Sequence, residues 1–235
     1  PPLTESGPNG VHFSPNKMHV FTADVFSGHI YMTSIEDNKT EIIYSHQYGA
    51  NTAIQDSLGN VWFTQSTENR NEARLFEAIG KPMSDGSVYR LPVLENGTFS
   101  SEPELVVEGI YFANGFYIDE KNNKFYLSET MANRVLSFDL DIKNGSLSNR
   151  KVLAKIPSPD NMQLNHDGSL WVASPLSNAS APICTKPDTS TLPCASSLPA
   201  PIAFCWHGFC AVPPPTTKSL VIRALSISLV ISLVD

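Results

Sequence analysis

The sequence predicts an all-β protein of the β-propeller class, and two observations support this prediction. First, four segments share one template: a polar residue, a short apolar run, a turn and a second strand. That strand ends 13 positions after the polar residue in three segments (22 − 9, 64 − 51 and 174 − 161) and 14 in the other (128 − 114). Second, two more strand-like runs follow in the first three segments, so four-stranded units repeat every 42 to 63 residues (51 − 9 and 114 − 51). This pattern is typical of propeller blades, whereas a β-sandwich would not predict matched offsets.

The strands of each unit are expected in chain order. The first unit has a turn at 14–17 and strands at 19–22, 28–32 and 40–44. The second has a turn at 56–60 and strands at 61–64, 86–91 and 104–107. The third has a turn at 119–124 and strands at 125–128, 133–138 and 150–154. The fourth has a turn at 165–168 and a strand at 170–174. The strands are rich in β-branched and aromatic residues, and the turns in Asn, Asp and Gly, which interrupt strands.

Two details refine this pattern. An insertion at 65–85 separates two strands of the second unit, and its run at 72–79 predicts one helical turn over the mouth of the propeller. Trp62 and Trp171 fall at matching strand positions, where packing between blades is the simplest role.

The repeats end near residue 178, and the composition then changes. Residues 1–178 are expected to form a partial propeller of about four blades, and 179–235 a low-complexity, irregular tail containing Pro, Ser and Cys. Such a composition buries too little apolar surface to offset the entropy lost on ordering. The apolar end, 219–235, is shorter than the roughly 20 residues that cross a bilayer and contains Arg223, so no stable membrane span is expected. Four blades would also leave unpaired strand edges, from which we expect association.

Charge and cysteine content exclude some classes of protein. A net charge of −7, from 16 basic and 23 acidic residues, argues against a nucleic-acid surface, which needs a basic stripe. All four cysteines lie after residue 180, so no disulfide scaffold holds the main domain. Glycosylation sequons beginning at Asn38, Asn96, Asn144 and Asn178 slightly favour a secreted or extracellular location over the cytoplasm. The chain begins at Pro1, so we expect the true N-terminus to have been removed or to be missing.

We call the polar residue that opens each unit its mouth residue. The mouth residues are Asn9, Asn51, Asn114 and the pair Asp160–Asn161. One such Asn is most simply a turn residue that bonds its own backbone. Four at matched offsets favour convergence on the propeller axis, where amide oxygens and one carboxylate would suit Ca²⁺, or Mg²⁺ or Mn²⁺. Zn²⁺ is the weakest candidate because no Cys or His occupies these positions.

Several motifs resemble one known family. Gly-Ala-Asn51, Phe-Ala-Asn114-Gly, Tyr-Leu-Ser-Glu129-Thr and Pro-Asp160-Asn161 are similar to motifs of the senescence-marker-protein/gluconolactonase/luciferin-regenerating-enzyme family and its paraoxonase-like relatives. The similarity covers about residues 5–178. It implies a six-bladed propeller with a divalent metal, usually Ca²⁺, in its central tunnel, of which this chain is a truncated copy.

The resemblance also implies site residues. Asn114 and Asp160 match metal ligands, Asn161 matches a further ligand, and Asn51 matches a ligand in some relatives and a substrate contact in others. Asn9, at the equivalent place in the first unit, is expected to contact substrate. The metal-binding Glu of the family precedes the matched region and has no counterpart here, and the last two blades are absent.

The implied function is metal-dependent hydrolysis of a small-molecule lactone or related ester. Asp160 is the one acid beside the metal, so it is the candidate base and also a candidate ligand. The sequence leaves open whether the truncated chain is active. An alternative is a non-catalytic propeller that binds a ligand or partner, and a weaker one is a metal-free lyase like strictosidine synthase.

The histidines and cysteines add little to this prediction. His12 is the best-placed histidine, but no histidine is expected to be catalytic. The Cys205–Cys210 run is only a weak candidate for a metal-binding knuckle.

Overall fold

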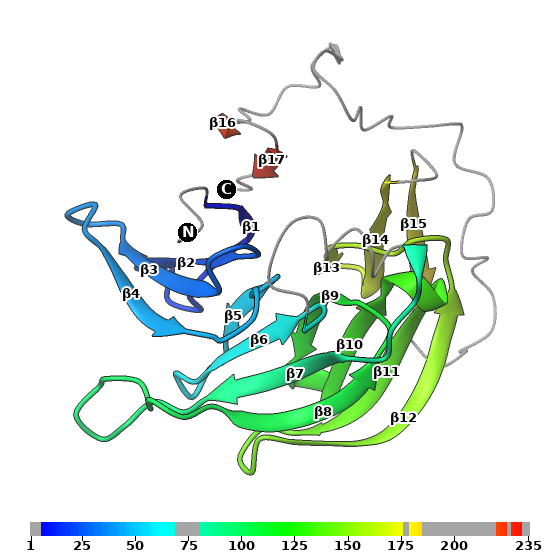
Figure 1. Cartoon of the computed structure of the whole chain (residues 1–235), viewed down its shortest axis with the longest axis horizontal. Coiled ribbons are helices and arrows are strands. Elements are labelled where there is room, and N and C mark those ends of the chain that lie inside the picture. The colour runs from blue at the N-terminus through cyan, green and yellow to red at the C-terminus, as the bar shows by residue number, and fades with distance from the viewer. Residues whose placement is uncertain (1–5, 69–79, 176–178, 185–219, 225–226, 232–235) are drawn as a thin grey trace. The chain divides into compact units, whose positions relative to one another are not determined.

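The computed structural model describes residues 6–68, 80–175, 179–184, 220–224 and 227–231 (Figure 1). The chain divides into two compact units, 1–202 and 203–235, which are considered separately. Within the described residues, regular structure is almost wholly β-strand, with two 3₁₀ turns, η1 (Glu120–Asn122) and η2 (Thr130–Ala132). The predicted all-β class is therefore confirmed.

The first sheet contains four strands in chain order. They are β1 (Pro8–Phe13), β2 (His19–Asp24), β3 (His29–Ser34) and β4 (Thr40–Ser45). Neighbouring strands are antiparallel. The β1–β2 turn begins at Ser14, whose hydroxyl accepts the His19 N–H at 2.9 Å. The turn predicted at 14–17 therefore closes on its own polar side chain, as Ser does in such turns.

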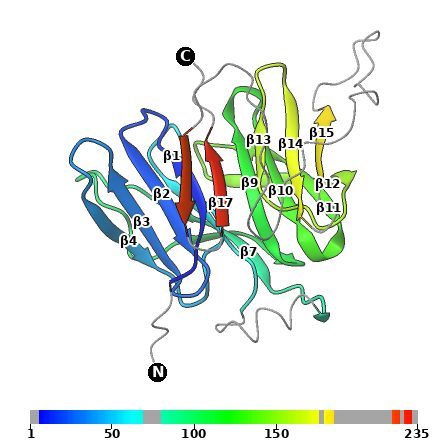
Figure 2. The ribbon, with the colours of Figure 1, turned by 90° about the horizontal axis from the view of Figure 1, so that it is seen from above.

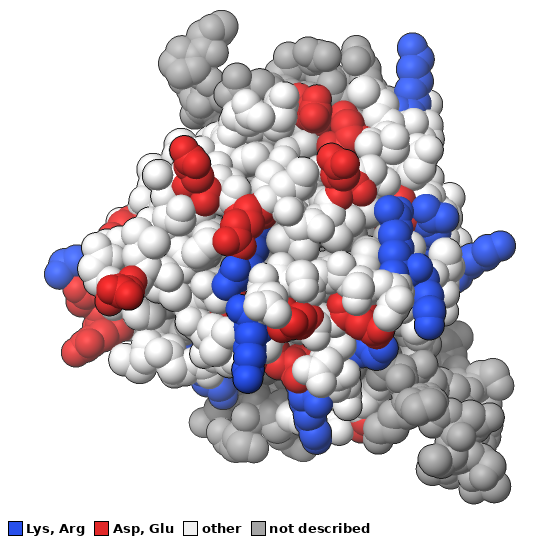
Figure 3. Space-filling view, turned by 90° about the horizontal axis from the view of Figure 1, so that it is seen from below, with Lys and Arg blue, Asp and Glu red and all other residues white. Residues whose placement is uncertain are grey.

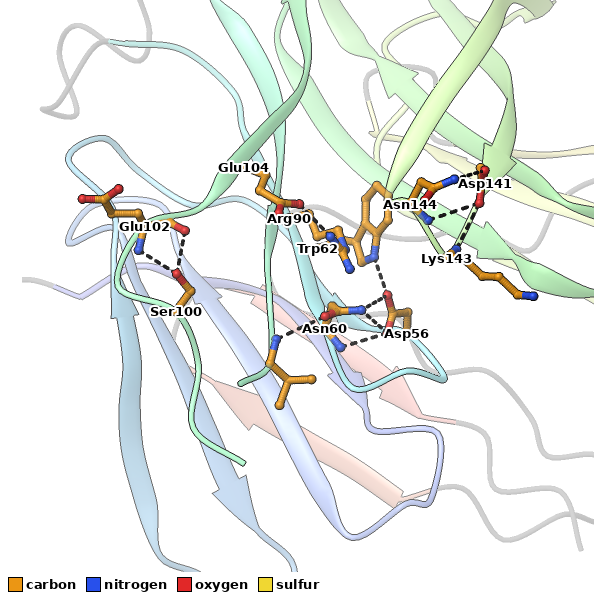
Figure 4. A network of polar contacts seen from close by, with 11 residues as sticks. Asp56, Asn60, Trp62, Arg90, Ser100, Glu102, Glu104, Asp141, Lys143 and Asn144 are labelled. Atoms are coloured by element: carbon orange, nitrogen blue, oxygen red, sulfur yellow. Dashed lines mark hydrogen bonds and ion pairs between the residues drawn. The ribbon is translucent and has the colours of Figure 1, made fainter. Parts of the chain in front are cut away.

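The second sheet repeats this order. Its strands are β5 (Ala53–Gln55), β6 (Val61–Gln65), β7 (Gly86–Leu91) and β8 (Glu104–Ile110). The Asp56 carboxylate fixes the β5–β6 turn by accepting the Asn60 backbone N–H at 2.8 Å and the Trp62 indole N–H at 2.8 Å (Figure 4). Because Asp56 is buried, these bonds satisfy a carboxylate that would otherwise be costly to desolvate. The helical turn expected at 72–79 lies outside the described residues.

The third sheet is the longest. Its strands are β9 (Ala113–Asp119), β10 (Lys124–Glu129), β11 (Arg134–Asp141) and β12 (Ser146–Lys155). Turn η1 joins β9 to β10, and Asp119 caps it by accepting the Asn122 N–H. Turn η2 joins β10 to β11 and ends at Asn133, whose φ of 52° lies in the left-handed region that Asn tolerates.

The fourth sheet has three strands. They are β13 (Met162–Leu164), β14 (Ser169–Ser174) and β15 (Ala179–Cys184). Strand β15 pairs with β14 from Ser174↔Ala179 to Ser169↔Cys184, beyond the boundary expected at 178. Pro182 lies in this strand, which has one hydrogen-bonded neighbour in its sheet, and an edge is where a strand tolerates proline.

Residues 185–219 lie outside the described part of the chain. In the C-terminal unit, β16 (Leu220–Ala224) pairs with β17 (Ile227–Ile231) as an antiparallel hairpin. Among the described residues, no helix is both long and apolar enough to cross a bilayer.

The four sheets of the first unit follow the arrangement of propeller blades. The first strand of each sheet lies toward the centre, and β4, β8 and β12 lie at the periphery (Figure 1). Strand β5 contacts β1, and β9 contacts β13, as Figure 2 also shows for the latter pair. The predicted β-propeller with about four blades is thus confirmed.

Each pair of consecutive sheets buries one apolar layer. Phe21 and Phe63 belong to the layer between the first and second sheets, and Trp62 and Phe116 to the next layer. Tyr126 and other residues of the third sheet pack on the fourth. Full burial of one such side chain contributes roughly 1.5–3 kcal/mol, so these layers hold the blades together.

The two tryptophans differ in their burial. The predicted core role of Trp62 is confirmed, because its side chain is fully buried. Trp171 is half-buried and donates its indole N–H to Ser169 at 3.1 Å.

Charge is mixed on the surface. On the face in Figure 3, Lys and Arg side chains lie among Asp and Glu side chains without forming one continuous stripe. This mixture gives that face no uniform positive potential.

Candidate functional site

The five mouth residues lie at the beginnings of the first strands. Asn9 is in β1 and Asn114 in β9, while Asn51 precedes β5 by two residues. The pair Asp160–Asn161 directly precedes β13. The common register of the repeats therefore puts the same residue type at the same point of each sheet.

Two glycines show how closely these strand starts approach one another. A Cβ at Gly10 would lie 2.7 Å from Thr52 Cα, and one at Gly115 would lie 2.5 Å from Asn161 Cα. Real Cβ atoms do not come so close, so both positions need glycine. The first strand of one sheet thus touches the start of the next first strand.

Thr52 joins two of the mouth residues. Its side chain is fully buried, and its hydroxyl lies 3.1 Å from Asn51 Oδ1 and 3.4 Å from Asn161 Oδ1. The two amide oxygens are therefore within reach of one atom, although 109 residues separate Thr52 from Asn161. Asn9 donates from Nδ2 to the Asn51 carbonyl at 3.3 Å, which connects the first sheet to this group.

Asn114 presents an oxygen that the protein leaves without a partner. The residue is buried, its Nδ2 donates to Thr130 Oγ1 at 3.1 Å, and its Oδ1 has no hydrogen-bond partner among the described residues. Ser128 Oγ is likewise buried and unpartnered within the described ranges. It lies in β10 at the bulge where the β9–β10 register shifts, between the pairs Leu127↔Phe116 and Glu129↔Ala113. Unpartnered buried oxygens are rare and call for an explanation such as a bound ion.

Asp160 supplies the carboxylate of the site. Burial raises its pKa to about 6, while hydrogen bonds from the Asn114 side chain and the Asn161 backbone act in the opposite direction. A buried carboxylate of this kind gains from a nearby cation, because the cation stabilises its charged form. The side chain nevertheless keeps some solvent exposure.

The backbone is strained just before Asn114 and just before Asp160. Phe112 has a φ of 63° and Ser158 a φ of 43°, and each stands two residues before a candidate ligand, Asn114 or Asp160. Left-handed φ is costly for residues other than glycine, and such strain concentrates at functional sites. The two buried residues occupy the same place in consecutive blades.

Thr130 holds these two strained segments together. Its Oγ1 accepts from Asn114 and donates to the Pro159 carbonyl at 2.7 Å, and its N–H donates to the Phe112 carbonyl at 3.2 Å. Because its hydroxyl accepts from Nδ2, Thr130 fixes which end of the Asn114 amide is left for a ligand.

Glu129 supports the same turn from the neighbouring position. Its carboxylate is fully buried, accepts the Tyr111 N–H at 3.0 Å, and forms ion pairs with Arg134 and Arg150. The sequence predicted no role for Thr52, Thr130 or Glu129, because a single hydroxyl or acid at a strand end or in a turn carries no spacing signal.

The histidines are not part of the hydrogen-bond network of the mouth residues in the described ranges. Burial lowers the pKa of His12, in β1, to about 4. Burial also lowers the pKa of His46, whose Nε2 lies 2.9 Å from Gln65 Oε1. His166 is exposed, in the turn predicted at 165–168. In the described ranges, no hydrogen bond joins a histidine to a mouth residue.

The donor set of the mouth residues suits a hard cation. Asn114 Oδ1, the Asp160 carboxylate and the amide oxygens of Asn51 and Asn161 are all oxygen donors, which Ca²⁺ accepts in variable geometry. Across the residues that the structure describes, no three His, Cys, Asp or Glu side chains gather as a metal site. The site is therefore an amide-rich one with a single acid, and Zn²⁺ fits it least.

Comparison with known proteins gives one family match. Residues 44–204 match the family model described as "SMP-30/Gluconolactonase/LRE-like region". Protein strictosidine synthase-like 13 of Arabidopsis thaliana is 23% identical over 172 residues, covering 71% of this chain and 41% of that protein. Regucalcin of Danio rerio is 30% identical over 89 residues, covering 34% of this chain and 30% of that protein. The chain thus spans less than half the length of either relative.

Solved structures share the fold. A gluconolactonase from Xanthomonas campestris superposes with a TM-score of 0.55 at 19% identity, over 74% of this chain and 57% of that one. A luciferin-regenerating enzyme gives 0.50 at 16% identity, over 76% and 72%. A structure of a nidogen–laminin complex gives 0.56 at 12% identity, over 74% and 57%. At these identities the likeness is one of fold alone.

Proposed function

Since the chain belongs to the SMP-30/gluconolactonase/LRE-like family, we propose that it is part of a divalent-metal-dependent hydrolase of lactones or related esters. The observation that carries the proposal is the unpartnered, buried Oδ1 of Asn114 beside the raised-pKa carboxylate of Asp160. One structural neighbour, the gluconolactonase from Xanthomonas campestris, is named for an activity of the same class.

Four side chains would hold the metal, with Ca²⁺ as the first choice and Mg²⁺ or Mn²⁺ as substitutes. They are Asn51, Asn114, Asp160 and Asn161. When bound, the cation would polarise the acyl carbonyl and stabilise the oxyanion that develops there. Asn114 is oriented for this role by Thr130, and the amides of Asn51 and Asn161 by Thr52.

Asp160 is also the proposed base. Lactone hydrolysis adds water across the acyl C–O bond: the water oxygen bonds to the carbonyl carbon, and its proton must go to a base. The Asp160 carboxylate would take that proton and return it to the departing alkoxide. Asn9 and Asn51, on the neighbouring strand starts, are the proposed substrate contacts.

Turnover with and without metal tests this proposal. Hydrolysis of gluconolactone and of an aryl ester by the purified chain is followed by proton release, in calcium and then in a chelator. We expect calcium-dependent turnover, and a loss of roughly 10²-fold or more in Asp160→Asn, which keeps the size of the side chain. Unchanged turnover in Asp160→Asn, or in the chelator, would refute the assignment.

A non-catalytic binding propeller is the second candidate. It is favoured by the single carboxylate among the mouth residues, since the other four are neutral amides. It predicts no hydrolysis of any lactone or ester in the same assay, and no heat when calcium is titrated into the chain.

A further inference from the structure

An open pocket lies next to the candidate site. Its volume is about 440 Å³, and it lies between turn η2 with the start of β11 and the end of β12. Seven residues line it: Ala132, Asn133, Arg134, Val152, Lys155, Ile156 and Pro157. Two of them are cationic and none is acidic, although the chain as a whole carries a net charge of −7.

Arg134 is anchored through Nε, which leaves its two terminal nitrogens available as hydrogen-bond donors. Its Nε donates to the fully buried Glu129 carboxylate, and its side chain is 31% exposed. The two terminal nitrogens have no hydrogen-bond partner among the described residues. A guanidinium anchored at one edge and free at the other presents a planar fork that matches a carboxylate or phosphate.

A second cation faces the same space. Lys155 pairs with Arg134 across the β11–β12 register, is exposed, and forms no ion pair with the described residues. Arg150 shares Glu129 with Arg134. Glu129 is thus shared by two arginines, and the unpaired Lys155 adds a further positive charge to the pocket lining, which contains no acid.

The pocket and the candidate site share two segments of chain. Turn η2 supplies Ala132 to the pocket and Thr130 to the site, and the segment before β13 supplies Pro157 to the pocket and Asp160 to the site. Asn133 Oδ1 accepts the Ser158 N–H at 2.8 Å and joins the two segments. Three residues of extended chain span at most ~11 Å, so Pro157 and Asp160 lie no farther apart than the length of a small ligand.

We propose that this pocket binds the anionic group of the substrate, a carboxylate or a phosphate, so that acidic lactones or esters are the preferred substrates. The inference rests on the proposed function for its site of reaction. Recognition of the anion is a property of the pocket alone and can be measured without turnover.

The first experiment compares two substrates in two variants. A sugar lactone bearing a free carboxylate is compared with its methyl ester in the wild type, in Lys155→Ala and in Lys151→Ala. Lys151 lies on the same strand, is exposed and is not a lining residue, so it serves as the matched control. We expect Lys155→Ala to lower kcat/KM for the acid about tenfold, mainly through KM, because one charge-assisted contact is lost. The ester should be unaffected in every variant, and an equal loss for both substrates would overturn the proposal.

The second experiment measures binding without metal or reaction. Gluconate and glucose 6-phosphate are titrated calorimetrically into the wild-type chain and into both variants, at low and high salt. Heat that Lys155→Ala weakens and salt suppresses supports the anion site, and the tighter ligand identifies carboxylate or phosphate. Such binding without lactone hydrolysis would keep the pocket and reject the proposed function. Hydrolysis that ignores substrate charge, with no anion binding, would reject the pocket alone.

Discussion

Replacement of Thr130 by valine tests how the candidate site is held together. The substitution keeps the shape of the side chain and removes the hydroxyl that accepts from Asn114 and donates to the Pro159 carbonyl. Thr130 is 8% exposed, so water cannot freely replace either bond. Each lost bond costs about 1 kcal/mol, and the stranded polar partners add to this, for a total of ~2–4 kcal/mol.

Two measurements follow from that magnitude. For a chain of this size, ~2–4 kcal/mol corresponds to a fall in Tm of ~4–16 °C by calorimetry. The Asn114 amide also becomes free to rotate, so we expect calcium affinity to fall roughly 10–100-fold, as when partners of metal ligands are removed. Thr130→Ser keeps the hydroxyl and loses one methyl group, and it should therefore retain calcium affinity. If Thr130→Val lost stability but bound calcium as the wild type does, the positioning role would be refuted.

Three further predictions concern the same framework. Gly115→Ala should lower the free energy of unfolding by ~1–3 kcal/mol in thermal unfolding and weaken calcium binding in calorimetry, because its Cβ would lie 2.5 Å from Asn161 Cα. Gly80→Ala is the control: its Cβ would meet nothing within 4 Å, so neither quantity should change. Glu129→Gln should destabilise the chain by ~2–4 kcal/mol in urea unfolding, since Arg134 and Arg150 lose a buried counter-charge. An unfolding transition with the same urea midpoint as the wild type would contradict this prediction. Burial lowers the pKa of His12 from 6.5 to about 4, so between these pH values the unfolded chain binds more protons than the folded chain. The free energy of unfolding should therefore be full above pH 6.5 and fall by at most about 3 kcal/mol towards pH 4. An equally steep fall in His12→Gln would disprove the assignment.

The strands could be predicted because their pattern is local. Alternation of β-branched and aromatic residues between Asn-, Asp- and Gly-rich turns appears in each repeat, and β2, β6, β10 and β14 cover the expected second strands. Strand β15 was not expected, because Ala-Ser-Ala-Pro-Ile-Cys has no alternation and contains a proline. It forms where β14 offers a free edge, which is a property of the assembled sheet and not of the segment.

The candidate site was predictable only in part, for a similar reason. Mouth residues such as Asn114 stand out because they recur at fixed offsets, and the structure brings them to the starts of the inner strands. Whether they bind metal stays a prediction. Thr52 and Thr130 could not be recognised, since each acts through contacts with residues distant in sequence, such as Asn161 for Thr52. The pocket residues Arg134 and Lys155 come together only through the β11–β12 register.

Calcium binding by the amide-rich site is the central claim, and a calorimetric titration of the chain tests it most directly. We expect the wild type to bind Ca²⁺, and both Asn114→Leu and Asp160→Asn to weaken that binding at least about tenfold, because each removes a proposed ligand group. Asn96→Ala, in an exposed turn, is the control and should bind as the wild type does. An absence of calcium binding in the wild type, or equal affinity in all four proteins, would contradict the account.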